Sequence, residues 1–349
     1  MSSKMMSTTR RVVIAAVAFT ALTGCAATHP ATTETAQPAL PQQTEATADA
    51  PYAPQGIAPC WVPVMQRLAA DGVAGPDVEG FFARLEPRIS EDPMGRKVKE
   101  LYTAKFLRPV LPPGTIPPKV VKPPLYPNVV TDANAERCAA FIAANRAAFV
   151  AAEARFGVPA EVSASLLFVE TRLGTNLGKA SAFATLASMS AATNPAQIPT
   201  WLAKLPDADT RRDWIAQRMQ QKADWAYAEL LALLRHARAN RLDPWQMPGS
   251  IYGAVGMCQF MPSNLRPYGA DGDGDGKVDL FTVADAVASL SNYLYRHGWR
   301  AGSDRATRHK ALRSYNHEDV YANTILALSD RVRVMQRTLG TPVSQTVPQ

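Results

Sequence analysis

The chain has 349 residues, enough for one or two domains with a sizeable core, and 47% of them are hydrophobic, as is typical of a globular protein. The formal net charge of +7 is mild, and no dense run of Lys and Arg with interleaved aromatic residues accompanies it. This composition argues against a nucleic-acid-binding protein. The positive balance suits an anionic polymer or a membrane surface, or is simply a solvated surface.

Residues 1–24 have the organisation of a secretory signal peptide. A lysine and two arginines form a basic n-region, and residues 12–22 are an apolar run that is too short to span a bilayer. The run leads into Leu-Thr-Gly-Cys at residues 22–25, which resembles a bacterial lipobox, in which the cysteine is acylated and becomes the first mature residue. The alternative is an ordinary secretory signal with a chance cysteine.

Acylation of Cys25 would anchor the mature protein to a membrane without a transmembrane helix, because each buried methylene contributes about 0.8 kcal/mol. Ala26, rather than Asp, follows the cysteine, which in lipoproteins of this kind points to the periplasmic face of the outer membrane. Residues 25–58 are rich in Ala, Thr, Gln, Pro and Glu and cannot bury enough apolar surface to fold. We therefore expect them to form a disordered tether.

Residues 59–131 are expected to form an N-terminal helical segment with a proline-rich connector. Helical patterns cover residues 60–107, and residues 109–127 hold eight prolines, which favour an extended and semi-rigid chain. The prolines could instead form a ligand for a partner domain, but a connector that runs over the surface is the simpler interpretation. Residues 132–340 then form the main domain, and residues 341–349 form a C-terminal tail.

Helical periodicity continues from about Asp132 almost to the end of the chain. Residues 210–241 predict one long helix, residues 284–297 predict a helix that Gly298 would close, and residues 319–339 predict the last helix. No stretch alternates between apolar and polar residues as a half-buried strand does. The predicted fold class is therefore mainly α.

One carboxylate lies deep in an apolar helical run. Gly157 ends one predicted helix, Pro159 suits the first turn of the next, and Glu170 follows four apolar residues on that second helix. Burial disfavours a charged carboxylate and raises its pKa, and a carboxyl group that stays protonated near neutrality can protonate a glycosidic oxygen. By itself, however, a single Glu in a helix is usually solvated or ion-paired.

A second motif, Gly-Ala-Val-Gly-Met-Cys-Gln-Phe-Met-Pro at residues 253–262, predicts a glycine-hinged turn that leads to the amide of Gln259. This motif and the run of residues 157–174 that contains Glu170 resemble the active-site pair of the lysozyme-like lytic murein transglycosylases, and the wider context resembles their membrane-bound B family. The resemblance implies a lysozyme-like catalytic domain in residues 132–340, an N-terminal helical domain before it, and Glu170 as the catalytic residue.

The same resemblance assigns substrate-binding residues. Gln259 would lie against the sugar and Ser250 close to Glu170, while aromatic and amide side chains late in the chain would line the cleft, namely Tyr293, Tyr315, Asn316 and Tyr321. Simple packing of the tyrosines in the core is the alternative. The chain departs from the family at Leu173, where the family often has an aromatic residue, and this difference bears on substrate preference.

An acidic loop follows the second motif. Residues 271–282 have acids at positions 1, 3 and 5 of an EF-hand pattern and glycine at position 6, and the lysine at position 7 could ligate through its backbone oxygen. Thr282 replaces the usual glutamate at position 12, and the resemblance implies an extended loop that Asp285 closes instead. A solvated turn without metal is the alternative to an EF-hand-like site for structural calcium, Ca2+. The expected ligands are Asp271, Asp273, Asp275, Lys277 and Asp285.

Lipidation of Cys25 would leave three cysteines in the mature chain. An oxidising periplasm permits disulfides, and Cys60 and Cys138 could pair because both lie outside the two motifs. Cys258 lies inside the second motif and is left over. Spacing alone does not establish this bond, and no CxxC pattern or nearby histidine pair suggests a metal site. No organic cofactor is expected.

The motifs contain only one candidate catalytic acid. Ordinary glycosidases need two carboxylates, whereas a lytic transglycosylase needs one. The resemblance implies that Glu170 protonates the β-1,4 glycosidic oxygen between N-acetylmuramic acid and N-acetylglucosamine in peptidoglycan. The same residue would then act as a base while the C6 hydroxyl attacks C1, which forms a 1,6-anhydro-N-acetylmuramic acid end without water.

Two other functions remain open at the level of the sequence. One is a muramidase that hydrolyses the same bond with water, and the other is a non-catalytic lipoprotein that binds peptidoglycan or scaffolds other wall proteins. The expected partners are peptidoglycan glycan strands, the membrane through a lipid anchor, and cell-wall enzymes or envelope machinery; no nucleic acid is expected.

Overall fold

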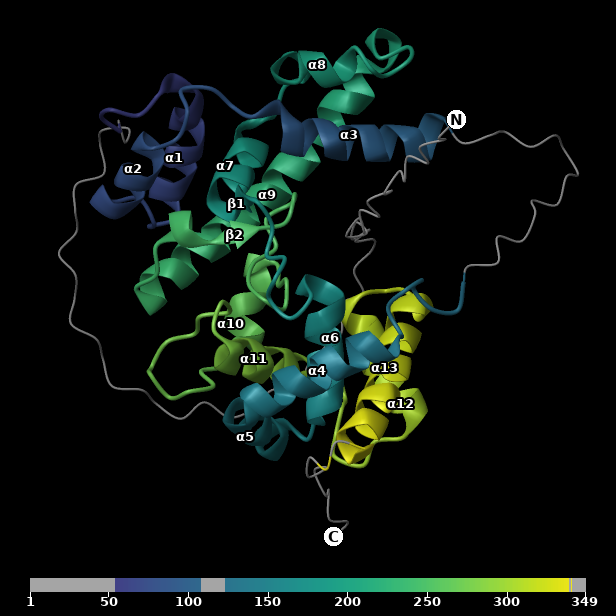
Figure 1. Ribbon diagram of the computed structural model, residues 1–349. Helices are drawn as coiled ribbons and strands as arrows, with labels where there is room; N and C mark the ends of the chain where they lie inside the picture. Colours follow the sequence, from purple (N-terminus) through teal and green to yellow (C-terminus); the bar gives the residue numbers. More distant parts are fainter. Residues whose placement is uncertain (1–53, 108–122, 339, 341–349) are drawn as a thin grey trace, which may run out of the picture. The chain divides into compact units, whose positions relative to one another are not determined.

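The computed structural model describes residues 54–107, 123–338 and 340, and they are mainly α-helical, which confirms the predicted fold class (Figure 1). Among these residues the only strands are β1 (Ala180–Ser181) and β2 (Pro248–Gly249), which pair antiparallel. The predicted signal peptide, the predicted acylation site Cys25 and most of the proline-rich connector lie outside the described residues. The C-terminal tail lies outside them as well.

The helices follow one another along the chain in three parts. The N-terminal part holds α1 (Val62–Ala70), α2 (Pro76–Ala83) and α3 (Glu91–Phe106). The middle part holds α4 (Asp132–Ala144), α5 (Arg146–Phe156), α6 (Ala160–Thr171), α7 (Ala182–Ala191), α8 (Pro199–Leu202) and α9 (Arg212–Asn240). The last part holds α10 (Leu265–Tyr268), α11 (Val283–Arg296), α12 (Arg305–Tyr315) and α13 (Asp319–Thr338).

Helix boundaries follow local sequence signals. Helix α5 ends where Gly157 takes a left-handed φ of 69°, and Pro159 is the N-cap of α6. The side chain of Thr282 caps α11 by accepting the Asp285 amide at 3.3 Å, and Gly298 with φ 96° follows its end. The long helices expected from periodicity are confirmed as α9, α11 and α13. None of the helices in the described part of the chain is both long and apolar enough to span a bilayer.

Helices α7 and α9 pack against each other and support the N-terminal helices. Helix α1 contacts α7, and the Phe82 ring of α2 meets the Phe183 ring of α7 edge-on with centroids 5.2 Å apart. Helix α3 packs on α7, α8 and α9 over a small apolar cluster of its own. At Gly95 of α3, an added Cβ would lie 2.1 Å from Cγ of Trp201 in α8, so the close approach of the two helices depends on glycine.

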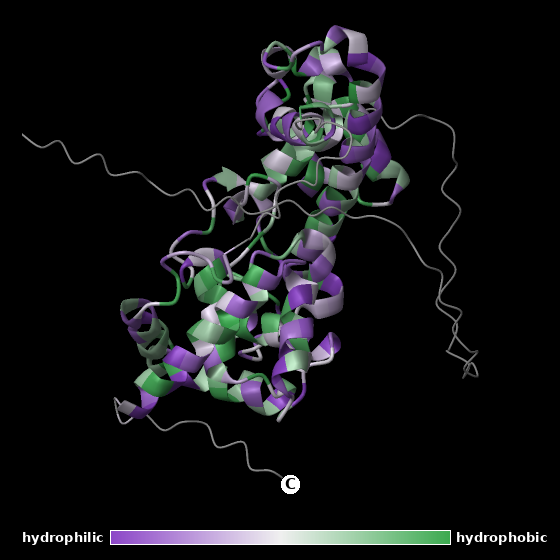
Figure 2. Cartoon of the chain, turned by 90° about the vertical axis from the view of Figure 1, so that its right-hand side faces the viewer, coloured by the Kyte–Doolittle hydropathy of each residue, from purple (hydrophilic) through white to green (hydrophobic). Residues whose placement is uncertain are grey.

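Helix α6 lies at the centre of the other helices. It packs against α4, α5, α11 and α13, and α12 in turn packs on α11 and α13. An ion pair joins α6 to α13, with Nη2 of the partly exposed Arg333 2.6 Å from Oε1 of the buried Glu161. Apolar residues gather where the helices meet and hydrophilic residues follow their outer sides (Figure 2). Helix α6, which carries Glu170 in its last turn, is therefore contacted by four other helices.

The predicted disulfide between Cys60 and Cys138 is wrong in this structure, where both residues are free cysteines. Cys60 belongs to a short 3-10 helix that packs on α1 and α7, whereas Cys138 is buried in α4 against α6. Because the two thiols belong to elements with different packing partners, their location outside the motifs was not a sufficient reason to pair them. Cys258 is also free and is fully buried.

Candidate active site

Glu170 lies in the last turn of α6, behind a run of eight buried residues, and its own side chain is partly exposed. Burial raises the pKa of this carboxyl from 4.5 to about 7, and a hydrogen bond from Tyr321 acts in the opposite direction. The Tyr321 hydroxyl donates to Oε1 of Glu170 at 2.6 Å. Glu170 can therefore both carry and release a proton near neutral pH while remaining within reach of a ligand.

Aromatic side chains form a wall beside the carboxyl group, which one of them, Tyr321, contacts directly. The rings of Tyr315 and Tyr321 stack at 6.2 Å with an interplanar angle of 13°, and Tyr293 lies 4.9 Å from Tyr315. Phe260 of the second motif is 5.8 Å from both Tyr293 and Tyr315. Tyr293 and Tyr321 are buried at 7% and 2% exposure, whereas Tyr315 is partly exposed. Of the three tyrosines assigned to the cleft, Tyr315 therefore offers a ligand the most surface.

Two hydroxyls fix this wall to the backbone. The Tyr293 hydroxyl donates to the Ser314 carbonyl at 2.6 Å, and the Tyr315 hydroxyl donates to the Cys258 carbonyl at 2.5 Å. Asn316 follows Tyr315 and is partly exposed beside it. The structure thus brings Tyr293, Tyr315 and Tyr321 together with Glu170 although they come from three different helices.

The second motif forms a compact turn. The Ser250 hydroxyl accepts the amides of Tyr252 and Ala254 at 3.3 and 3.0 Å, so this side chain organises the turn itself. Gly253 has a φ of 87°, and an added Cβ there would lie 2.6 Å from Cγ of Leu186, so the turn rests directly on α7. Gln259 also has a left-handed φ of 51° and remains partly exposed. Its Nε2 donates to the Gly256 carbonyl at 3.0 Å, which orients the rest of the amide.

Thr171 connects the two motifs, and no role for its side chain was predicted from the sequence. Its hydroxyl donates to the Met257 carbonyl at 2.7 Å and accepts the Gly174 amide at 3.0 Å. Gly174 has a φ of 86°, and an added Cβ would lie 2.8 Å from Cε of Met257. The hydroxyl next to Glu170 and the glycine three residues later were the available signals. Together they set the spacing between the end of α6 and the turn that carries Gln259.

The backbone after Glu170 is strained. Arg172 and Leu173 have φ values of 55° and 61°, and Gly174 continues the left-handed run. Each non-glycine residue in this region costs about 1–2 kcal/mol. Such outliers persist only where the surrounding structure holds them, and they cluster at functional sites. Here the left-handed run ends α6 directly after Thr171, so that Glu170 lies in the last turn of the helix.

A second carboxylate, which belongs to neither motif, acts on a tyrosine that the charge of Glu170 also influences. The hydroxyl of Tyr126 makes a long hydrogen bond of 3.5 Å to Oε2 of Glu318. The pKa of Tyr126 is raised to about 12, first by burial and then by the negative charges of Glu318 and Glu170. Tyr126 is anchored by its own amide, which donates to Thr324 Oγ1 at 2.8 Å. Neither residue belongs to a motif, so only the fold could place them here.

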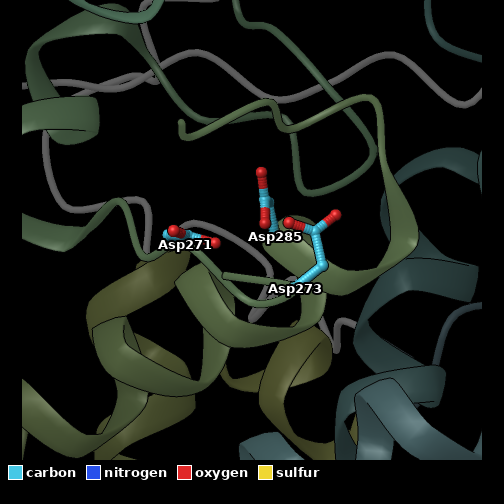
Figure 3. A group of neighbouring side chains, drawn as sticks. All are labelled: Asp271, Asp273 and Asp285. Carbon is cyan, nitrogen blue, oxygen red and sulfur yellow. The ribbon is translucent and has the colours of Figure 1, made fainter. Parts of the chain in front are cut away.

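The acidic loop brings three of its predicted ligands together. One carboxylate oxygen from each of Asp271, Asp273 and Asp285 lies within 4.8 Å of the others (Figure 3). Asp285 is buried and accepts the amides of Gly272 and Asp279 at 2.7 and 2.6 Å. Such an all-oxygen set fits a hard cation such as Ca2+. These three acids could therefore hold the metal.

The other loop residues are placed differently. Asp275 is exposed and lies outside this three-acid group, and its carboxylate accepts the Lys277 amide at 2.8 Å. The side chain of Thr282 caps α11 and thus has a structural use in place of a ligating one. The loop is also fixed from α5, because Arg155 donates to the Asp271 carbonyl at 3.3 Å.

A family model described as "Transglycosylase SLT domain" matches residues 57–309. The chain belongs to this family. The protein is 29% identical over 255 residues to the membrane-bound lytic murein transglycosylase B of Escherichia coli strain K12, a match that covers 70% of this chain. The chain spans 63% of the length of that relative.

Solved structures of lytic transglycosylases share the fold. The soluble lytic transglycosylase SltB1 of Pseudomonas aeruginosa aligns with a TM-score of 0.56 at 22% identity over 81% of this chain and 100% of its own. Escherichia coli Slt35 in complex with calcium aligns with a TM-score of 0.57 at 19% identity over 80% of this chain and 94% of its own. At these identities the likeness establishes the fold, and it confirms the mainly helical transglycosylase architecture.

Proposed function

We propose that the protein is a lytic murein transglycosylase. It cleaves the β-1,4 bond between N-acetylmuramic acid and N-acetylglucosamine in peptidoglycan and forms 1,6-anhydro-N-acetylmuramic acid ends. The observation that carries this proposal is the environment of Glu170, whose pKa is raised to about 7 and whose Oε1 accepts the Tyr321 hydroxyl at 2.6 Å. Family membership and the similarity to transglycosylase B of Escherichia coli support it.

The reaction needs one carboxyl group that changes protonation twice. Protonated Glu170 donates to the glycosidic oxygen as the bond from C1 to that oxygen breaks, and N-acetylglucosamine leaves with a free 4-hydroxyl. The muramic N-acetyl group stabilises the cationic centre at C1. The Glu170 carboxylate then takes the proton of the C6 hydroxyl while the C6 oxygen bonds to C1. This step closes the anhydro ring and restores the protonated Glu170 without water.

The neighbouring residues have distinct roles in this proposal. The amide of Gln259 orients the sugar, and Ser250 acts by holding the turn beside it, because its hydroxyl accepts two backbone amides. The partly exposed Tyr315 and Asn316 contact the glycan strand, while Tyr293 and Tyr321 back the wall behind them. Tyr321 also tunes Glu170, because its hydrogen bond favours the charged carboxylate and limits the rise in pKa.

We also propose that the mature protein is lipidated at Cys25 and located at the periplasmic face of the outer membrane. The similarity to a membrane-bound relative supports an envelope location, and the peptidoglycan strands there are its substrate. Cell-wall enzymes and envelope machinery are candidate partners. The acidic loop binds Ca2+ in a structural role through Asp271, Asp273 and Asp285, with Asp275 and the Lys277 carbonyl completing the set; calcium in the Slt35 complex supports this assignment.

The test is mass spectrometry of the soluble muropeptides released from purified sacculi by residues 58–349, beside the variant Glu170→Gln. We expect products one water lighter than reducing muropeptides from the first protein and none from the variant. A variant that still releases these anhydro products would contradict the role of Glu170.

A hydrolytic muramidase is the second candidate, because Glu318 provides a second carboxylate: it accepts the hydroxyl of Tyr126, a tyrosine whose pKa the charge of Glu170 also raises. Two carboxylates could divide the roles of acid and base and activate a water. Reducing-end products in the same experiment, lost in both Glu170→Gln and Glu318→Gln, would establish this mechanism. No products from any protein, with the chain still pelleting with sacculi, would instead support a non-catalytic peptidoglycan-binding lipoprotein.

A further inference from the structure

Helix α3, far from the two motifs in sequence, is bonded to the turn of the second motif. The Tyr252 hydroxyl donates to Oε1 of Glu100 at 2.5 Å, across 152 positions of the chain. Tyr252 is only 8% exposed, and burial and the Glu100 carboxylate both raise its pKa far above the ordinary value, so the hydroxyl keeps its proton and remains a donor. A charge-assisted hydrogen bond of this kind is roughly twice as strong as a neutral one.

Lys97 closes this contact into a triangle. Its Nζ lies 2.8 Å from Oε2 of Glu100 and 3.8 Å from the centre of the Tyr252 ring. The lysine is 7% exposed although it carries a charge, and buried lysines are rare unless they are paired. Both carboxylate oxygens of Glu100 are thus occupied, one by each partner, and Tyr252 is held by its hydroxyl and by its ring.

Tyr252 directly precedes the second motif, which begins at Gly253. The Gly253 amide donates to the Ser250 carbonyl at 3.0 Å, which makes Ile251 and Tyr252 the central residues of a tight turn. Ile251 at that turn is 47% exposed, whereas its neighbour Tyr252 points into the protein. The orientation of the whole turn therefore follows from where the Tyr252 side chain is anchored.

Hydrogen bonds and short stretches of main chain connect this turn to Gln259. The Ser250 amide donates to the Ala254 carbonyl at 2.9 Å, and the next residue, Val255, pairs with Phe260 through bonds of 2.8 and 3.1 Å. Gln259 directly precedes Phe260, and its main-chain N–H and its side-chain Nε2 both donate to the Gly256 carbonyl. A displacement at Tyr252 is therefore transmitted to the position of the Gln259 amide.

We propose that Lys97 and Glu100 are positioning residues of the catalytic site, which act through Tyr252 to fix the turn that presents Gln259 to the sugar. The inference rests on the proposed transglycosylase function. It assigns the N-terminal helical segment a part in catalysis, since the anchor of the turn lies on α3. Because a shift of about 1 Å in a positioned group can cost a hundredfold in rate, loss of a single hydrogen bond in this linkage should be measurable.

The test uses Tyr252→Phe, which removes one oxygen and keeps the ring over Lys97. We expect kcat for anhydro-product release from soluble peptidoglycan oligosaccharides to fall about tenfold, with KM changed less than about twofold, because the Michaelis contacts remain while the aligned geometry is lost. The double variant Glu100→Ala/Tyr252→Phe should be no slower than the slower single variant, because Glu100→Ala removes the acceptor and Tyr252→Phe removes the donor of the same hydrogen bond.

Tyr227→Phe is the matched control. Its hydroxyl donates to Asp71 and its ring lies 3.8 Å from the guanidinium carbon of Arg67, so a buried tyrosine again meets a carboxylate and a cation, here between α1 and α9, although Arg67 pairs with Asp224. It should lower the melting temperature about as much as Tyr252→Phe and leave kcat unchanged. Equal losses of kcat in both variants would mean that the effect is only one of stability, which would overturn the inference.

Amide hydrogen exchange separates this inference from the proposed function because it needs no activity. In a Glu170→Gln background, residues 249–260 should exchange faster in Tyr252→Phe and remain unchanged in Tyr227→Phe. Unchanged exchange in Tyr252→Phe would overturn the linkage, whatever the enzyme does. If the wild-type chain releases no anhydro product, the proposed function fails, and with it the catalytic role of Lys97 and Glu100, while exchange still reports whether α3 holds the turn.

Discussion

Glu170 illustrates how one side chain serves function at the expense of stability. Burial raises its pKa from 4.5 to about 7, so the folded state favours the protonated form more than the unfolded chain does. The stabilising contribution of that proton is fully present below pH 4.5 and is lost as the pH rises through about 7. Above that range the folded protein carries a carboxylate in a poorly hydrated place.

Replacement of Glu170 by Gln should therefore stabilise the protein in a pH-dependent way. The gain in free energy of unfolding over the wild type should be larger at about pH 8 than at about pH 5, by about 1–3 kcal/mol. Urea denaturation at both pH values measures this difference. Glu136→Gln, at an exposed position of α4, should follow the wild type at both pH values, and an equal gain for Glu170→Gln at the two pH values would contradict the raised pKa.

At the level of elements, the sequence predicted helix boundaries well, because these depend on residues close together in the chain. Gly157 and Pro159 marked the break between α5 and α6, and Gly298 marked the end of α11, because caps depend on the conformation of one or two residues. Periodicity placed α9 and α13 within two residues of their observed ends, because their apolar stripes face a core.

Contacts between distant segments could not be predicted in the same way. Tyr126 is bonded to Glu318 and to Thr324 of α13 and is influenced by the charge of Glu170, and no local pattern encodes this meeting of distant segments. The proposed pairing of Cys60 with Cys138 failed for the same reason, since spacing does not reveal which elements are neighbours. The convergence of three acids in the acidic loop was predictable because an EF-hand pattern fixes side chains within one short loop.

Replacement of two helical glycines by alanine should change the free energy of unfolding in opposite directions. Gly95→Ala in α3 should lower the free energy of unfolding by about 1–3 kcal/mol, because the new methyl group would meet the Trp201 ring of α8. Gly80→Ala in α2, where nothing lies within 4 Å of an added Cβ, should raise it by about 0.5–1 kcal/mol. Thermal or urea denaturation of both variants tests the packing of α3 on α8, and equal effects would contradict it.

At the level of the whole molecule, parts distant in sequence support one another. The predicted boundary after residue 131 coincides with the start of α4, yet the helices before it pack on α7, α8 and α9, which come after it. The acidic loop is likewise connected to distant parts of the chain, because Asp285 belongs to α11, which packs on α5, α6 and α12. A ligand that binds this loop should therefore stabilise most of the chain.

Calcium should raise the melting temperature of the wild-type protein, and a chelator should reverse the effect. At a free concentration one hundred times Kd the expected gain is about 2.7 kcal/mol. Asp285→Asn should abolish the calcium-dependent shift, because this buried acid is one of the three that converge. Asp275→Asn should reduce the shift without abolishing it, because its carboxylate lies outside that group, and a wild-type protein insensitive to calcium would contradict the site.

The bond from the Thr171 hydroxyl to the Met257 carbonyl has a consequence for motion. It joins a side chain adjacent to Glu170 to the main chain two residues before Gln259, so thermal fluctuations should carry the acid and the amide together. The surrounding loops can then move to admit or release a long polymer while the distance between the Glu170 carboxyl and the Gln259 amide stays constant. A strand that slides through such a site would meet the same geometry at every register.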